Sequence, residues 1–153
     1  MNNNYREIKN LIEITLLSKG KVYVCKINKA DLYLVNPFNW YYKTGYAYTR
    51  INGKEVSMHV LLLGIKEGFI VDHINRSRLD NRRINLRHVT KSQNGMNRVT
   101  RGYYWNKQFE LWESQIRVKS KKLFLGRFEK EQDALNSRIK AEKKYYGQFA
   151  YKR

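Results

Sequence analysis

Apolar residues in this chain come in short runs that polar and charged residues interrupt. No run exceeds four residues, as at 60–63, whereas a membrane-spanning helix needs roughly 20 apolar residues in succession. The N-terminus begins Met-Asn-Asn-Asn and lacks the apolar core of a secretory signal. The single cysteine, Cys25, excludes an internal disulfide framework and a cysteine-rich zinc module. We therefore expect an α+β fold of short strands and helices, in a cytoplasmic protein with no membrane partner.

The charge of the chain is strongly positive and evenly spread. Its 153 residues include 31 Lys and Arg against 13 Asp and Glu, which gives a formal net charge of +18. Residues 1–97 carry 16 basic and 7 acidic side chains and residues 98–153 carry 15 and 6, so each part has a net charge of +9. A membrane-binding protein would concentrate the excess on one amphipathic helix. Charge interleaved with Tyr, Trp and Asn favours a nucleic-acid backbone as partner, and the alternative is a basic surface that binds nothing.

The first third of the chain is rich in predicted strands. Residues 22–27 alternate weakly and are β-branched, which is typical of a strand. Asn52-Gly53 follows a tyrosine-rich segment and is the strongest short signal for a hairpin, because both turn positions need positive φ. We expect the return strand at 55–60. His59, within it, is either a packed hairpin histidine or a phosphate contact.

The middle of the chain gathers side chains that can bind a metal or accept a proton. A short apolar strand at 69–74 contains Asp72 and His73, and an arginine-rich loop follows it. A second strand is expected at 84–89, and Thr90 is a suitable N-cap for a helix to about residue 98. Strand, loop, strand and helix in this order should bring four side chains within reach of one another: Asp72, His73, Asn85 and Asn94.

The last third predicts three strands followed by one helix. We expect the strands at 103–105, 111–118 and 122–128, and a helix at 130–146 whose apolar residues share one face. Since a three-stranded sheet must cover one face, this helix is its cover, and the free face would present basic and aromatic side chains to a DNA groove. The residues expected to contact DNA from this domain are Arg101, Trp105, Gln115, Arg117, Lys119, Lys122 and Phe124. Trp105 and Trp112 are expected to divide between the core and the DNA face.

The middle and last thirds resemble two known modules. The run Val-Asp-His-Ile-Asn at 71–75 and the run at 79–97, which begins Leu-Asp-Asn-Arg-Arg-Ile-Asn-Leu, resemble the HNH endonuclease motif of phage and intron homing enzymes. Asn85 follows His73 by twelve residues and Asn94 follows Asn85 by nine, which is the spacing of the motif. Residues 102–150 resemble the AP2-like DNA-binding domain that often accompanies it. The resemblance implies two domains. Residues 1–98 would hold β-hairpins leading into a ββα-metal nuclease module, and residues 99–153 an AP2-like sheet on one helix.

The same resemblance implies a chemistry and assigns roles. Asp72 and Asn94 would bind one Mg²⁺ or Mn²⁺ ion, His73 would be the general base, and Asn85 would fix the loop that orients His73. Phosphodiester hydrolysis needs such a base because the attacking water must lose a proton. Many relatives have histidine at the position of Asn94, but asparagine keeps an oxygen ligand, so we expect activity. Arg87 is expected to clamp the cleaved phosphate.

Three functions remain open from the sequence. The first is a site-specific endonuclease that nicks double-stranded DNA, as a monomer or a DNA-bound dimer, encoded by a phage or mobile element and acting in a bacterial host. The second is a DNA-binding regulator with a vestigial nuclease centre. The third is an RNA-binding protein, which no K/R-G-F/Y-G-F-V stacking motif supports.

Single residues also have structural interpretations. His73 alone would be typical of a surface strand end, and Asn85 and Asn94 are equally typical of turns and caps. Arg87 and His88 suit a solvated strand surface. Cys25 is expected to be a small buried hydrophobe.

Overall fold

The computed structural model describes residues 3–98 and 100–151. They form two compact units, Met1–Lys91 and Ser92–Arg153. The boundary predicted between residues 98 and 99 lies on the C-terminal side of this division, and residue 99 itself is outside the described residues. Each unit is α+β, with small antiparallel sheets joined by short helices. None of the helices in the described part of the chain is long and apolar enough to cross a membrane.

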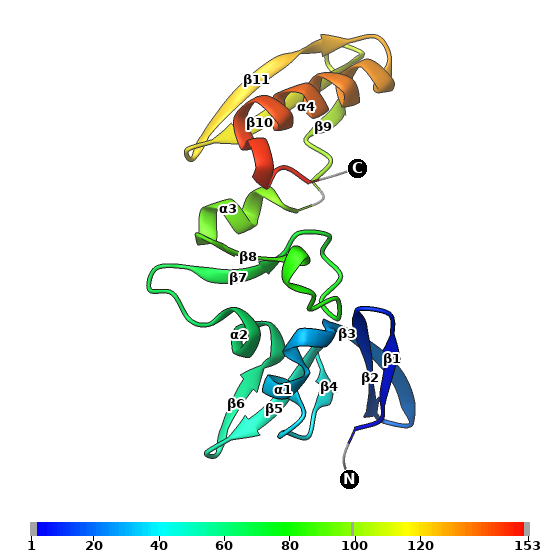
Figure 1. The fold of residues 1–153 in the computed structure, drawn as a ribbon. Coiled ribbons are helices and arrows are strands. Elements are labelled where there is room, and N and C mark those ends of the chain that lie inside the picture. The colour runs from blue at the N-terminus through cyan, green and yellow to red at the C-terminus, as the bar shows by residue number, and fades with distance from the viewer. Residues whose placement is uncertain (1–2, 99, 152–153) are drawn as a thin grey trace. The chain divides into compact units, whose positions relative to one another are not determined.

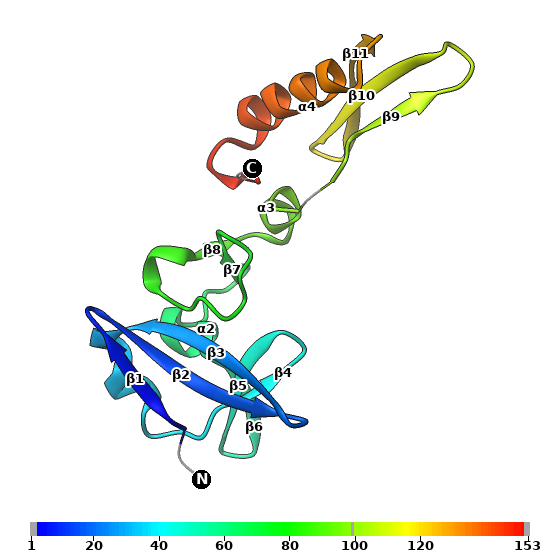
Figure 2. The same cartoon turned by 90° about the vertical axis from the view of Figure 1, so that its right-hand side faces the viewer.

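The first unit opens with a three-stranded antiparallel sheet in the order β1-β2-β3 (Figures 1 and 2). Its strands are β1 (Tyr5–Ile8), β2 (Leu11–Ser18) and β3 (Lys21–Asn28), the last of which contains the strand predicted at 22–27. Alternation along β2 buries Ile12, Ile14 and Leu16 on one face. The sheet thus supplies one wall of the hydrophobic core.

A second small sheet follows the short helices η1 (Lys29–Asp31) and α1 (Leu32–Val35). Its strands, in the order β4-β5-β6, are β4 (Tyr41–Lys43), β5 (Tyr46–Ile51) and β6 (Lys54–Ser57). Asn52 and Gly53 turn between β5 and β6 with φ of 49° and 75°, so the predicted hairpin is confirmed.

The return strand is shorter than the predicted 55–60. It ends at Ser57, and residues 58–60 begin helix α2 (Met58–Leu63). Met58 and Leu62 are four residues apart and both buried, which is the helical rather than the strand period. Gly64, with φ of 80°, ends the helix. The prediction was wrong here because a short apolar run fits either period.

The segment that carries the predicted site is a two-stranded ribbon. Strands β7 (Ile70–His73) and β8 (Leu86–Val89) pair antiparallel, with Asp72 opposite Arg87 and His73 opposite Leu86. Residues Arg83–Asn85 form the helix η2, so the second strand begins two residues later than predicted. Helix α3 (Lys91–Met96) starts at the last residue of the first unit and continues into the second. The packing of a ββα-metal module therefore stays a prediction.

The second unit contains a three-stranded sheet covered by one helix (Figures 1 and 2). Strands β9 (Tyr103–Asn106), β10 (Leu111–Val118) and β11 (Lys121–Phe128) are antiparallel with β10 in the centre. Helix α4 (Glu131–Tyr146) packs on β10 and β11, and η3 (Gly147–Phe149) follows it. The predicted sheet and helix are confirmed.

Candidate functional site

Asp72 and His73 lie at the end of β7 and are both buried, with exposed fractions of 9% and 4%. Oδ2 of Asp72 accepts hydrogen bonds from Nε and Nη2 of Arg87, at 3.0 and 2.9 Å, across the ribbon. The chain turns directly after the strand, where the backbone amide of Arg76, with φ of 63°, donates to the carbonyl of His73. Asp72 is thus a buried carboxylate whose charge a cation already offsets.

The imidazole of His73 is held by a partner that the sequence did not predict. Its Nε2 lies 3.0 Å from Oδ1 of Asn81, a side chain with no exposed surface. Burial lowers the pKa of His73, against the opposing effects of the Asn81 hydrogen bond and of the carboxylates of Asp72 and Asp80. A neutral imidazole at pH 7 can accept a proton. Because a carbonyl oxygen only accepts, Nε2 carries the ring proton and Nδ1 is the basic nitrogen.

Asn85 ties together both ends of the loop that follows His73. Its Oδ1 accepts from the backbone amide of Asn75 at 2.9 Å, and its Nδ2 donates to the carbonyl of Asp80 at 2.7 Å. Its own carbonyl accepts from the amide of Ile74 at 2.8 Å. This geometry suits a residue that fixes the loop, and the catalytic consequence stays a prediction.

His59 of α2 lies beside the predicted site. Its ring centroid is 5.0 Å from that of His73 and 5.1 Å from that of Tyr46. Its Nε2 is 3.3 Å from Oγ of Ser57. Burial, and next the proximity of His73, lower the pKa of His59 to about 4. His59 is therefore a packed, neutral histidine near the candidate base.

Arg78 is a second residue that the sequence analysis missed. Its guanidinium lies 4.7 Å from the ring centroid of Tyr46 and donates to the carbonyl of Thr44 at 3.2 Å. Its positive charge contributes to the lowered pKa of His73. Gly45 makes room, since a Cβ there would come within 3.1 Å of the guanidinium. One loop arginine among five gave no signal that would have distinguished it.

The candidate metal ligands are oxygen donors, the carboxylate of Asp72 and the side-chain amide of Asn94. No group of three or more His, Cys, Asp or Glu side chains able to hold a metal occurs within 3–98 and 100–151. Asn94 belongs to α3 in the second unit, so its joining Asp72 stays a prediction. The chemistry of the donors nevertheless fits a hard cation, because carboxylate and amide oxygens are the ligands that Mg²⁺ and Mn²⁺ prefer.

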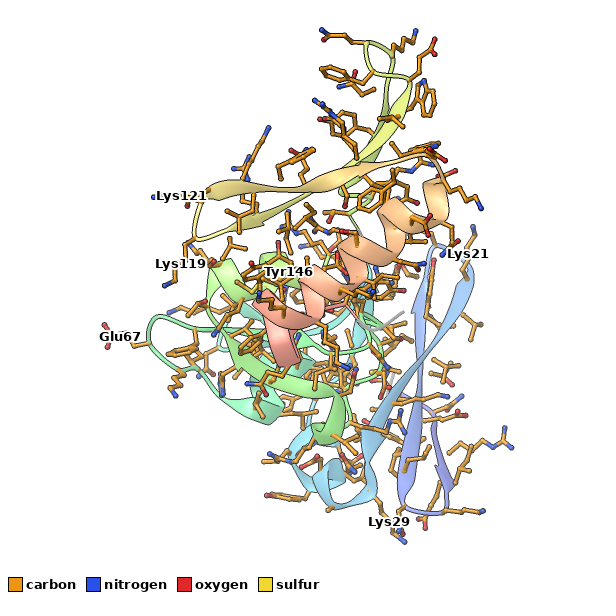
Figure 3. All side chains as sticks on the ribbon, turned by 90° about the horizontal axis from the view of Figure 1, so that it is seen from above. Lys21, Lys29, Glu67, Lys119, Lys121 and Tyr146 are labelled. Carbon is orange, nitrogen blue, oxygen red and sulfur yellow. The ribbon has the colours of Figure 1, made fainter. Side chains whose placement is uncertain are left out.

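The second unit contains a basic cavity of about 450 Å³. Four residues that we predicted to contact DNA line it: Gln115, Arg117, Lys119 and Lys122. Arg98, Arg138 and Tyr146 also line it. Lys119 and Lys121 extend from the turn between β10 and β11, and Tyr146 lies near the end of α4 (Figure 3). The lining holds five basic side chains and no acidic one, which suits an anion.

Arg138 is the buried anchor of this cavity. Its Nε donates to Oε1 of Glu142 at 2.9 Å and its Nη2 to Oγ1 of Thr100 at 3.1 Å. Its Nη1 donates to the carbonyl of Gln115. A Cβ at Gly102, where φ is 64°, would lie 2.7 Å from the guanidinium. Glycine at position 102 therefore leaves room for Arg138 to hydrogen-bond to α4, to β10 and to Thr100, which precedes β9.

Two further residues that we predicted to contact DNA, Phe124 and Arg101, do not line this cavity. Phe124 is 61% exposed, and Arg127, which we did not predict, lies 3.5 Å from the ring centroid of Phe109. Arg127 also donates to Glu113 at 2.9 Å. The guanidinium of Arg101 lies 5.9 Å from the ring centroid of Tyr103.

The two tryptophans do not divide between the faces as predicted. Trp105 and Trp112 are register partners with ring centroids 5.6 Å apart, so they share one face. Alternation along β10 places that face with buried Ile116, opposite Gln115 and Arg117. A contact of Trp105 with DNA would therefore use a different surface from theirs.

Cys25, His88 and Arg87 each have defined surroundings in the structure. Cys25 is buried, as expected. His88 is not simply solvated, because its Nε2 lies 3.0 Å from the carbonyl of Gly64. Arg87 is mostly buried against Asp72, so its predicted phosphate contact would compete with this ion pair.

Comparison with known proteins agrees with the geometry of the first unit. Residues 61–96 match the HNH endonuclease family, and this segment includes Asp72, His73, Asn85 and Asn94. An uncharacterized HNH endonuclease of Acanthamoeba polyphaga mimivirus is 32% identical in an alignment 99 residues long, which covers 61% of this chain and 53% of that protein. The chain thus spans about half the length of the curated relative that it matches. No solved structure gave a significant match.

Residues 61–96 are thus similar to HNH endonucleases. The family match ends at residue 96, so the AP2-like resemblance of the second unit and the homing type stay predictions.

Proposed function

We propose that this chain is a divalent-metal-dependent DNA endonuclease that hydrolyses a phosphodiester bond. The observation that carries the proposal is the geometry of His73, which is buried and hydrogen-bonded through Nε2 to Asn81 within the segment that matches HNH endonucleases. Burial lowers the pKa of His73 and so favours the neutral imidazole. A neutral imidazole whose proton is fixed on one nitrogen keeps the other nitrogen basic. That is the requirement for a general base.

Each residue of the site has a proposed part in the reaction. Nδ1 of His73 takes the proton from the attacking water, and Asn85 keeps the loop beside it in place. Asp72 and Asn94 would hold one Mg²⁺ or Mn²⁺ ion, with Arg87 giving up the Asp72 carboxylate. When bound, the metal supplies positive charge to the phosphate and to the departing oxygen. One such site per chain favours a nick in one strand.

The second unit would hold double-stranded DNA. Its basic cavity and the exposed outer face supply cationic and aromatic side chains for the backbone and the groove. From its resemblance to AP2-like domains, we propose that the second unit recognises the target sequence. The whole chain would then be a homing-type endonuclease of phage or mobile-element origin.

Cleavage of supercoiled plasmids that carry fragments of the source genome tests the nuclease. With Mg²⁺, the wild type should produce open circles, whereas His73→Ala should bind the same DNA without cutting it. EDTA should abolish cutting by the wild type. Intact DNA after incubation of the wild type with plasmids that it binds would refute the proposal.

DNA binding by the second unit can be tested separately. Lys119→Gln with Lys122→Gln should weaken DNA binding and reduce the salt dependence, by a slope of about two for two lost phosphate contacts. The matched control is Lys140→Gln with Lys144→Gln, because these lysines of α4 do not line the cavity. An equal loss of DNA affinity in both double variants would show that binding depends on net charge and not on the cavity.

A DNA-binding regulator with a vestigial centre is the second candidate. The ion pair of Asp72 with Arg87 favours it, since a neutralised carboxylate binds a metal less well. Equal DNA binding by the wild type and His73→Ala, with no cutting by either, would be its signature.

A further inference from the structure

Three side chains link His73 to the N-terminal sheet through buried hydrogen bonds. Oδ1 of Asn81 accepts from Nε2 of His73 at 3.0 Å, and Nδ2 of Asn81 donates to Sγ of Cys25 at 3.0 Å. Sγ of Cys25 in turn donates to Sδ of Met58 at 3.4 Å. Asn81, Cys25 and Met58 have no exposed surface. The series therefore runs from the candidate base through β3 to the start of α2 without contact with water.

The hydrogen bonds of this series all run in one direction. The thiol of Cys25 donates its one hydrogen to Sδ of Met58, which has no hydrogen to donate, so the sulfur lone pairs of Cys25 accept from Asn81. Burial raises the pKa of Cys25 to about 12, so the thiol keeps its proton. The amide group of Asn81 must then point its NH₂ toward Cys25 and its oxygen toward His73.

The opposite orientation of Asn81 would reverse the tautomer of His73. If the amide were rotated by half a turn, its NH₂ would face Nε2, which would then have to accept. The ring proton would move to Nδ1 and occupy the nitrogen that a general base uses. Because Sγ of Cys25 accepts from the NH₂ of Asn81, residue 25 favours the orientation of the Asn81 amide that is seen in the structure.

The backbone around Asn81 keeps the loop against β3. The amide of Lys26 donates to the carbonyl of Leu79, and the amide of Asn81 donates to the carbonyl of Lys26, both at 2.8 Å. Lys26 and Asp80 form a parallel β-bridge. Farther along, the amide of Arg83 donates to Oδ1 of Asn28 at 2.8 Å. The loop thus lies along the edge of the strand that contains Cys25.

We propose that Cys25, acting through Asn81, is a positioning residue that selects the Nε2-protonated tautomer of His73. The N-terminal sheet then contributes directly to the active site, although no residue of β1–β3 lies in the HNH segment. The inference rests on the proposed function for its effect on cleavage, but the tautomer can be measured without any cleavage.

Nitrogen NMR of the imidazoles tests the proposal. The chain has three histidines, so a His73→Gln variant identifies the signals of His73. The wild type should show His73 protonated at Nε2. Cys25→Ala removes the acceptor for Asn81 and should introduce the Nδ1-protonated form, whereas Cys25→Ser restores an acceptor and a donor and should return the wild-type signals.

Cleavage by the same variants gives the second readout. We expect kcat to fall roughly tenfold or more for Cys25→Ala, within the range that a general base contributes, with KM for DNA unchanged and with recovery in Cys25→Ser. Ile27→Val is the matched control, because Ile27 is buried on the same face of β3 but outside the series. It should keep the tautomer and the rate.

Two results would overturn the proposal. One is a wild-type tautomer in folded Cys25→Ala, and the other is the same change of tautomer in Ile27→Val. If Cys25→Ala does not fold, Cys25→Val serves instead, because valine fills the buried position but offers no acceptor to Asn81. A wild-type tautomer of His73 in that variant would refute the argument. A correct tautomer in a protein that never cuts DNA would instead count against the proposed function alone.

Discussion

Acidification should destabilise the first unit through His59 and His73. The pKa of His59 falls to about 4 in the folded protein because of burial and the neighbouring His73, whereas the unfolded chain has a value near 6.5. The unfolded state therefore binds the proton more readily. The stability associated with neutral His59 is complete above about pH 6.5 and is lost as the pH falls toward 4.

The two pKa values set the size of this effect. Linkage gives a loss of about 2 kcal/mol for His59 between about pH 7 and pH 5. His73, whose pKa is also lowered by burial, adds to the loss in the same direction. The His59→Gln variant keeps a polar group near Ser57 but cannot titrate, so its stability should depend less on pH by about 2 kcal/mol over this interval.

Urea unfolding followed by the fluorescence of Trp40 measures this difference. Trp40 is buried in the first unit, and the other two tryptophans of the chain, Trp105 and Trp112, are in the second. Replacing Trp105 and Trp112 by phenylalanine makes the signal specific for the first unit. Equal pH dependence in wild type and His59→Gln would refute the reasoning, because it would show that His59 titrates normally in the folded state.

Two further substitutions test features of the site and of the basic cavity. Arg87→Gln should free the carboxylate of Asp72 and tighten Mn²⁺ binding, measured by EPR, roughly three- to tenfold. The control Arg82→Gln frees Asp80 instead and should leave Mn²⁺ binding unchanged. Unchanged binding in Arg87→Gln would exclude Asp72 as the metal ligand. Gly102→Ala should destabilise the second unit more than Gly20→Ala destabilises the first, by roughly 1–3 kcal/mol. Both glycines have positive φ, but only at Gly102 does the new methyl group meet a guanidinium. Equal losses in thermal unfolding would contradict a role for this close approach.

Local signals in the sequence predicted the parts of the fold that depend on near neighbours. Asn52-Gly53 predicted a hairpin because the turn itself requires those residues, and the periodic apolar face predicted α4. Residues 58–63 were misassigned because a short apolar run satisfies both strand and helix until its packing partners are known.

The candidate site was predictable only where its residues are close in the sequence. The spacing of His73, Asn85 and Asn94 indicated the motif, but Asn81 was missed because an asparagine in a charged loop is indistinguishable from an ordinary turn residue. Its importance comes from Cys25, which is 56 residues away. Such a contact depends on tertiary structure that no local pattern encodes.

The pairing of the loop with Lys26 also bears on how this protein avoids self-association. Strand β3 is at the edge of its sheet, and an unpaired edge is a template for another chain. The carbonyl of Leu79 and the amide of Asn81 occupy the hydrogen-bonding groups of Lys26 on that edge. The segment that holds the candidate base thus also shields the sheet, so a substitution that detaches this loop would be expected to promote aggregation together with any loss of activity.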